Sequence, residues 1–172
     1  LEIKDIKKIL KTIKKSFNIP KDAEITIEAN PDTVDLNYLK ALKKIGINRI
    51  SFGIQSIFDN ELEVLGRLHD YQTAKTAVLN AKKAGFDNIS VDLMYGIYHQ
   101  TFESFSASLI EITTLPITHI SIYCMKLSEN VPLYHRWDLP IVGDDIQADM
   151  YLFAVQALKN AGFEQYEISN FA

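Results

Sequence analysis

Cysteine is almost absent from this 172-residue chain, whose single thiol is Cys124. One cysteine excludes an internal disulfide and any multi-cysteine metal site built from this chain alone. Chains without disulfides are typical of reducing compartments, so we expect a cytoplasmic protein. The four histidines, His69, His99, His119 and His135, show neither an i, i+4 pair nor the spacing of metal ligands. We therefore predict no metal ligand within the chain.

Long apolar runs and an excess of positive charge are also missing. No stretch approaches the ~20 apolar residues of a membrane-spanning helix, so we expect no transmembrane segment. A net charge of -4 leaves no basic field to hold a polyanion, which argues against nucleic-acid binding. The one basic run, residues 4–15, alternates lysines with isoleucines at helical spacing, and we interpret its lysines as a solvated helix face.

The composition that remains, 47% hydrophobic and 23% charged, is that of a globular domain with its own core. We expect a single domain over residues 1–172, with a first helix at 1–17 followed by repeating strand and helix units at 24–172. Periodicity and capping signals give the boundaries. The other predicted helices are 34–45, 59–65, 71–84, 101–113 and 144–161, and the predicted strands are 24–28, 49–55, 88–93, 119–123 and 165–168.

Three predicted helices end in the same way, with a glycine followed by an apolar residue that opens the next strand. These glycines are Gly46, Gly85 and Gly162. Glycine accepts the left-handed conformation that commonly ends a helix. Strands that alternate with helices in this way favour right-handed crossovers and a parallel sheet or barrel.

Within the predicted strands, residue parity separates two faces. Isoleucine, valine and phenylalanine occupy one parity, which suits packing against helices, whereas serine, glycine and larger polar groups occupy the other. A barrel turns such a polar face toward its lumen, so the fold class that we predict is α/β, an incomplete (β/α) barrel. The polar parity ends in Glu28, Gln55 and Asp92, at the strand ends where barrel enzymes carry their sites. Capping of the following turns is the alternative role for these three side chains.

Several sequence blocks together resemble the oxygen-independent coproporphyrinogen III oxidase-like family of radical S-adenosylmethionine (SAM) proteins. They lie in family order along most of the chain. They are Ile27-Glu-Ala-Asn-Pro31, Arg49-Ile-Ser-Phe-Gly-Ile-Gln-Ser56, Leu65-Gly-Arg-Leu-His69, Asn88-Ile-Ser-Val-Asp-Leu-Met-Tyr-Gly96 and Gln165-Tyr-Glu-Ile-Ser-Asn-Phe171.

The resemblance implies a six-stranded incomplete barrel that binds SAM beside a [4Fe–4S] cluster and cleaves it reductively. It also implies roles for matching residues. Glu28 corresponds to a carboxylate near the SAM amino group, Gln55 and Asp92 to residues on the ribose side, and Arg67 to the base that meets the SAM carboxylate. An arginine and a carboxylate form a charge-assisted pair. Backbone at 124–126 corresponds to the border of the adenine.

Two departures from the family pattern stand out. Ile97-Tyr98-His99 replaces the usual Leu-Pro-Gly, and the CxxxCxxC cluster motif lies upstream of the matched region. The chain also begins with Leu1 and with a helix that no strand precedes. We therefore expect a fragment that lacks two strands and the cluster ligands, and that does not cleave SAM by itself.

The family contains two activities. The residues of the Glu-Ala-Asn-Pro, Leu-Gly-Arg-Leu-His and Tyr-Glu-Ile-Ser-Asn-Phe-Ala blocks look closer to haem chaperones of the HemW type, which bind haem and deliver it to respiratory proteins. The alternative is an anaerobic oxidase that decarboxylates coproporphyrinogen III. A second alternative, an unrelated (β/α)-barrel enzyme such as an aldolase, requires a lysine or metal ligands in the lumen, and no lysine lies on the polar parity.

Overall fold

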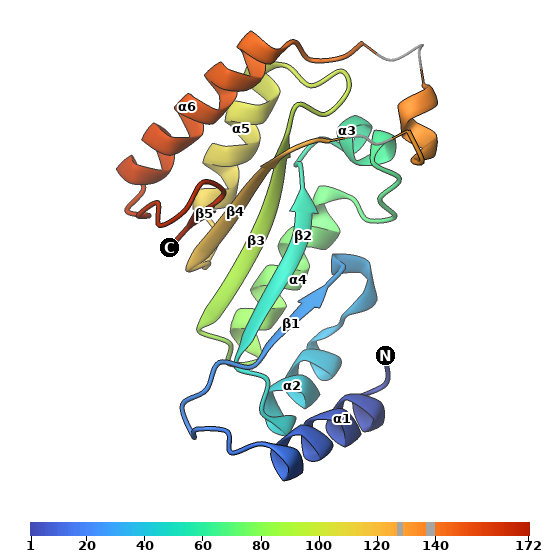
Figure 1. Cartoon of the computed structure of the whole chain (residues 1–172), viewed down its shortest axis with the longest axis vertical. Coiled ribbons are helices and arrows are strands. Elements are labelled where there is room, and N and C mark those ends of the chain that lie inside the picture. The colour runs from blue at the N-terminus through green and yellow to red at the C-terminus, as the bar shows by residue number, and fades with distance from the viewer. Residues whose placement is uncertain (127–128, 137–139) are drawn as a thin grey trace.

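The computed structural model describes residues 1–126, 129–136 and 140–172, and Figure 1 shows their arrangement. The helices are α1 (Ile3–Ser16), α2 (Leu36–Ile45), α3 (Asp59–Val64), α4 (Tyr71–Lys83), α5 (Phe102–Thr113) and α6 (Asp144–Asn160), with short 3-10 helices η1 (Pro31–Thr33) and η2 (Pro132–His135). The strands are β1 (Thr26–Ala29), β2 (Arg49–Gln55), β3 (Asn88–Tyr95), β4 (His119–Cys124) and β5 (Asn170–Phe171).

The strands form one sheet in the order β1-β2-β3-β4-β5. The first four are parallel neighbours, which confirms the predicted order and direction of these strands. Since β1 and β5 are the two edges, the sheet stays open, as an incomplete barrel requires. The carboxyl ends of β1 to β4 therefore share one edge, at the top of Figure 1.

The predicted last strand at 165–168 is wrong in position. The ladder forms instead at Asn170 and Phe171, which pair antiparallel with β4, and Gln165 makes only an isolated bridge to Phe171. The reason is burial: Phe171 is fully buried, whereas Tyr166 and Ile168 are 62% and 74% exposed. The buried side chain decides where the chain meets the sheet.

Local capping explains where helices begin and end. Asp35 accepts a hydrogen bond from the Tyr38 N–H at 2.7 Å, so α2 begins after it rather than at residue 34 as predicted. Thr101 and Ser104 form a reciprocal capping box at the start of α5. Gly46 ends α2 with φ 104°, the left-handed value expected at this junction.

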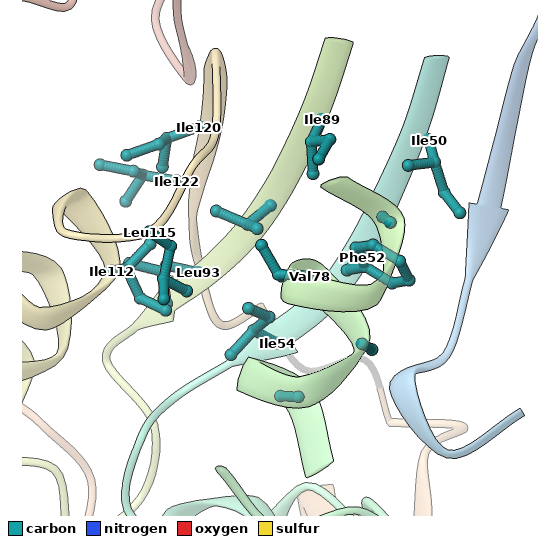
Figure 2. Close-up of a cluster of buried hydrophobic side chains, with 14 of the residues drawn as sticks. Ile50, Phe52, Ile54, Val78, Ile89, Leu93, Ile112, Leu115, Ile120 and Ile122 are labelled. Carbon is teal, nitrogen blue, oxygen red and sulfur yellow. The ribbon is translucent and has the colours of Figure 1, made fainter. Parts of the chain in front are cut away.

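The apolar parity of the sheet packs against helices. Ile50, Phe52 and Ile54 of β2 point toward α4, where Val78 is fully buried (Figure 2). Ile89, Val91, Leu93, Ile120 and Ile122 continue the same face across β3 and β4 and are at most 1% exposed. Burial of one such side chain stabilises a fold by about 1.5–3 kcal/mol. The opposite face carries the polar parity, as predicted.

Candidate functional site

A polar pocket of about 290 Å³ lies at the carboxyl ends of β1, β2 and β3. It is lined by Glu28, Ala29, Asn30, Gly53, Gln55, Arg67 and Asp92. The structure thus brings together all four residues that the sequence singled out, from four separate segments. Sequence reasoning missed Ala29, Asn30 and Gly53 as lining residues, although all three lie inside blocks that carry the family resemblance.

The loop after α3 carries Arg67 into this pocket. The backbone N–H of Arg67 donates to the Leu62 carbonyl at 2.9 Å, and Nη1 donates to Asn30 Oδ1 at 3.1 Å. Two residues further on, His69 is buried, with Nε2 lying 3.4 Å from the Ile54 carbonyl oxygen. The loop is therefore fixed to both β2 and the segment after β1, and it presents a planar guanidinium suited to bind a carboxylate.

Gln55 ends β2 in a strained backbone conformation. Its φ is 72°, and the Ser56 N–H donates to the Ile54 carbonyl at 3.0 Å, so the three residues form a γ-turn of the rare type with positive φ. Such a conformation costs about 1–3 kcal/mol and persists only where its surroundings impose it. The turn coincides with a register shift between β2 and β3.

The side chain of Gln55 is also unusual. Its Oε1 atom is buried and accepts no hydrogen bond from the described residues. A buried acceptor without a partner costs free energy, which a ligand donor in the pocket would recover. Space for the Gln55 side chain depends on Gly53, because a Cβ there would lie 2.9 Å from Gln55 Nε2 and 3.7 Å from Arg67 Nη1.

Asp92 supplies a half-buried carboxylate on β3. Burial raises its pKa, the nearby charge of Glu28 adds to this, and hydrogen bonds from Tyr123 and Ser51 oppose it. Ser51 Oγ donates to Asp92 Oδ1 at 3.3 Å. Burial and the charge of Asp92 raise the pKa of Tyr123 to about 12, so Tyr123 stays a hydrogen-bond donor at neutral pH. Glu28, in contrast, is exposed.

The turn after β3 shows how the chain accommodates the Ile97-Tyr98-His99 departure. His99 takes φ 65°, the left-handed conformation that glycine would adopt without strain at this position. The Gln100 N–H donates to the Ile97 carbonyl at 2.9 Å, and Gln100 Nε2 donates to the Met94 carbonyl at 3.2 Å. The turn is thus closed by its own hydrogen bonds.

Two of the cavities outside this pocket bear on the predicted site. One, of about 510 Å³, includes Met94, Met125 and Lys126 in its lining, so part of the segment expected to border the adenine faces an adjacent space. The other, of about 640 Å³, lies at the amino ends of the strands and includes Arg49 and His119. Although larger, this last cavity is at the end where barrel enzymes do not carry their sites.

No described residues form a metal centre. Among residues 1–126, 129–136 and 140–172, no group of three or more His, Cys, Asp or Glu side chains is placed to hold a metal ion. Cys124 Sγ lies 2.7 Å from Gln147 Oε1, and burial raises the pKa of its thiol. A [4Fe–4S] cluster is held by several thiolates, so these residues do not fit one.

Comparison with known proteins places the chain in a family. Residues 1–111 match the family described as the radical SAM superfamily. The chain belongs to this superfamily. Its polar pocket lies at the carboxyl edge of the sheet, the end where barrel proteins carry their sites.

Two curated relatives are more specific than the superfamily match. The chain is 34% identical to the haem chaperone HemW of Bacillus subtilis, over 100% of this chain and 46% of that protein. It is 39% identical to the haem chaperone HemW of Haemophilus influenzae, over 95% of this chain and 43% of that protein. The chain thus spans less than half the length of these two relatives.

Solved structures agree on the fold. The coproporphyrinogen III oxidase HemN of Escherichia coli, a radical SAM enzyme, superposes with a TM-score of 0.89 at 24% identity, over 100% of this chain and 40% of that one. At this identity the likeness establishes the fold alone. No helix of the described residues combines the length and hydropathy needed to cross a membrane.

Proposed function

We propose that this chain forms the SAM-binding part of a haem chaperone of the HemW type. One observation carries the proposal: the four residues implied by the family resemblance line a single pocket. The relatives named as HemW, at 34% and 39% identity over nearly the whole chain, support the choice of branch.

The chemistry of the pocket fits SAM residue by residue. Arg67 provides a guanidinium for the carboxylate of the methionine moiety, and Glu28 provides an anion for its amino group. Gln55 Oε1, the buried acceptor without a partner among the described residues, would accept from a ribose hydroxyl. The Asp92 carboxylate would accept from a second ribose hydroxyl. SAM would therefore donate a hydrogen bond to Gln55 Oε1 and accept hydrogen bonds from the Arg67 guanidinium.

SAM bound beside a [4Fe–4S] cluster supplies radical chemistry in this superfamily. The pocket residues bind and orient SAM, and the part of the chain that the structure describes offers no ligand set for the cluster. Haem as cargo, respiratory proteins as its recipients and a cytoplasmic location are parts of the same proposal. Haem as cargo rests on the names of the relatives, respiratory proteins as recipients rest on the family resemblance, and the location rests on the absence of disulfides.

The alternative is an anaerobic coproporphyrinogen III oxidase. The superposition with HemN covers the whole chain, yet at 24% identity it shows the fold and not the reaction. The Bacillus subtilis and Haemophilus influenzae relatives, both above 30% identity, are named as haem chaperones, which favours transport of haem over decarboxylation of its precursor.

A direct test uses the full-length polypeptide that contains this chain, purified anaerobically and reconstituted with iron and sulfide. The proposal predicts a shifted Soret band on addition of haem, and no protoporphyrinogen from coproporphyrinogen III in the presence of SAM and dithionite. Protoporphyrinogen formation would establish the oxidase instead. Calorimetry of SAM binding to Glu28→Ala tests the pocket separately, with weaker binding expected.

A further inference from the structure

The γ-turn at Gln55 is held on both sides by buried polar side chains. Upstream, the Ile54 carbonyl oxygen lies 3.4 Å from His69 Nε2. Downstream, Ser56 Oγ donates to Glu61 Oε2 at 2.5 Å and accepts from the Phe58 N–H at 3.0 Å. Glu61 itself does not line the pocket.

Glu61 is the centre of a buried network. Its side chain is on α3, the residue is only 1% exposed, and its second oxygen accepts from Ser104 Oγ at 2.5 Å. Gln100 Nε2 donates to Glu61 Oε2 at 3.0 Å and also to the Met94 carbonyl. A buried carboxylate is expensive unless hydrogen bonds compensate it, and in this network three side chains donate to it.

The network joins segments that meet only at the carboxyl edge of the sheet. Ser56 follows β2, Gln100 closes the turn after β3, and Ser104 lies in the first turn of α5. A strained γ-turn relaxes toward ordinary strand geometry unless both of its ends are fixed. Fully buried Ile54 fixes one end, and the Ser56 to Glu61 contact fixes the other.

We propose that Glu61 is a positioning residue for the SAM pocket: through Ser56 it maintains the strained turn that holds the Gln55 side chain at the ligand. The inference rests on the proposed function, because SAM is the ligand whose affinity depends on the position of the Gln55 side chain. Glu61 acts without touching that ligand. The carboxylate accepts through both of its oxygens, whereas an amide at the same place keeps one acceptor oxygen and directs an NH2 group at a neighbour that donates to Glu61 in the parent.

The experiment compares two glutamates of the same helix in the full-length, reconstituted polypeptide. Glu61→Gln keeps the volume and removes the charged acceptor; Glu63→Gln makes the same change at an exposed position. Calorimetry should show SAM binding about tenfold weaker in Glu61→Gln, the loss typical of residues that orient ligand-contacting groups. Affinity in Glu63→Gln should stay within about twofold of the parent, as at most surface sites.

A double-variant cycle distinguishes positioning from general destabilisation. If Glu61 acts through Gln55, then Glu61→Gln causes no further loss of SAM affinity when it is added to Gln55→Ala. Equal losses in both backgrounds, or parental affinity in Glu61→Gln, would overturn the proposal.

Should Glu61→Gln fail to fold, Ser56→Ala removes the connecting hydroxyl alone. It must weaken SAM binding, and again only while Gln55 is present; unchanged affinity in Ser56→Ala would overturn the proposal. Unchanged affinity in both Gln55→Ala and Arg67→Ala would overturn the proposed SAM site, and the role of Glu61 with it. Losses in those two variants without a loss in Glu61→Gln would overturn the role of Glu61 alone.

Discussion

The two faces of the sheet are built from alternate residues of the same strands, yet they differ in burial, backbone strain and charge. The face toward the helices carries Ile50, Phe52 and Ile54 in complete burial. The other face carries Gly53, strained Gln55 and a half-buried Asp92 whose pKa is raised by burial. The first face gains free energy from every side chain; the second carries strain, a half-buried charge and an acceptor without a partner among the described residues. Stability and binding are therefore separated by residue parity.

The largest expected effect comes from truncating matched aromatic side chains on the two faces. Phe52→Ala should lower the local free energy of unfolding by about 3–5 kcal/mol, since it leaves a cavity in the core. Tyr123 lies on the polar face and is 39% exposed. Tyr123→Ala should therefore lower the free energy of unfolding by less than about half as much. Native-state hydrogen exchange of the β2 and β3 amides in the full-length polypeptide measures both. Equal losses would show that the two faces do not differ.

A smaller effect is expected from Asp92→Asn, which should trade binding for stability. The folded-state pKa of Asp92 lies above the ordinary value of 3.8, so the folded state holds this proton more tightly than the unfolded state does. Stability from this group therefore falls as pH rises through the raised pKa, and at neutral pH the buried charge is a cost. Asp92→Asn removes that cost and also removes a carboxylate acceptor for SAM.

Melting temperatures of the ligand-free full-length protein test whether Asp92→Asn raises stability at neutral pH. Asp92→Asn should melt higher than the parent at neutral pH, and the difference should shrink as the pH falls through the raised pKa of Asp92. SAM affinity of the parent should fall over the same interval, because protonation of Asp92 competes with the ribose hydroxyl, and this pH dependence should be weaker in Asp92→Asn. A variant that melts lower at every pH would contradict the account of Asp92.

The smallest effect is expected from adding one methyl group to the polar face. In Gly53→Ala the new Cβ would lie 2.9 Å from Gln55 Nε2, the movable end of a side chain, so the fold adjusts while Gln55 is displaced. SAM affinity should fall about threefold with stability changed by less than about 0.5 kcal/mol. Gly143→Ala is the control, because no atom of the described residues lies within 4 Å of a Cβ there. Equal affinities in the two variants would show that Gly53 has no role in the pocket.

Much of the fold was predictable because parity and helix caps are local signals. The alternation of Ile50, Phe52 and Ile54 with polar residues predicted both faces of β2, and Gly46 marked the end of α2, although its start was predicted at residue 34, two residues early. The last strand was misplaced because the choice between 165–168 and 170–171 depends on which side chain reaches the core. That choice is a tertiary property of Phe171.

The four main pocket residues were predictable, but the contacts that hold them in position were not. The position of Glu28, Gln55 and Asp92 at successive strand ends placed them at one edge, and the family resemblance added Arg67. The γ-turn at Gln55 and the network around Glu61 were not predictable, because they depend on contacts between segments far apart in sequence: Glu61 and Ser104 are separated by 43 positions. Their SAM-binding roles stay a prediction.

The most direct test of the central claim compares two arginines of the full-length, reconstituted protein by calorimetry with SAM. Arg67 lines the carboxyl-edge pocket, and Arg49 lines the larger cavity at the opposite edge. Arg67→Ala should weaken SAM binding by about tenfold to a hundredfold, the loss expected for a charge-assisted hydrogen bond, while Arg49→Ala leaves the affinity at the parental value. Parental affinity in Arg67→Ala, or an equal loss in Arg49→Ala, would contradict the assignment of SAM to this pocket.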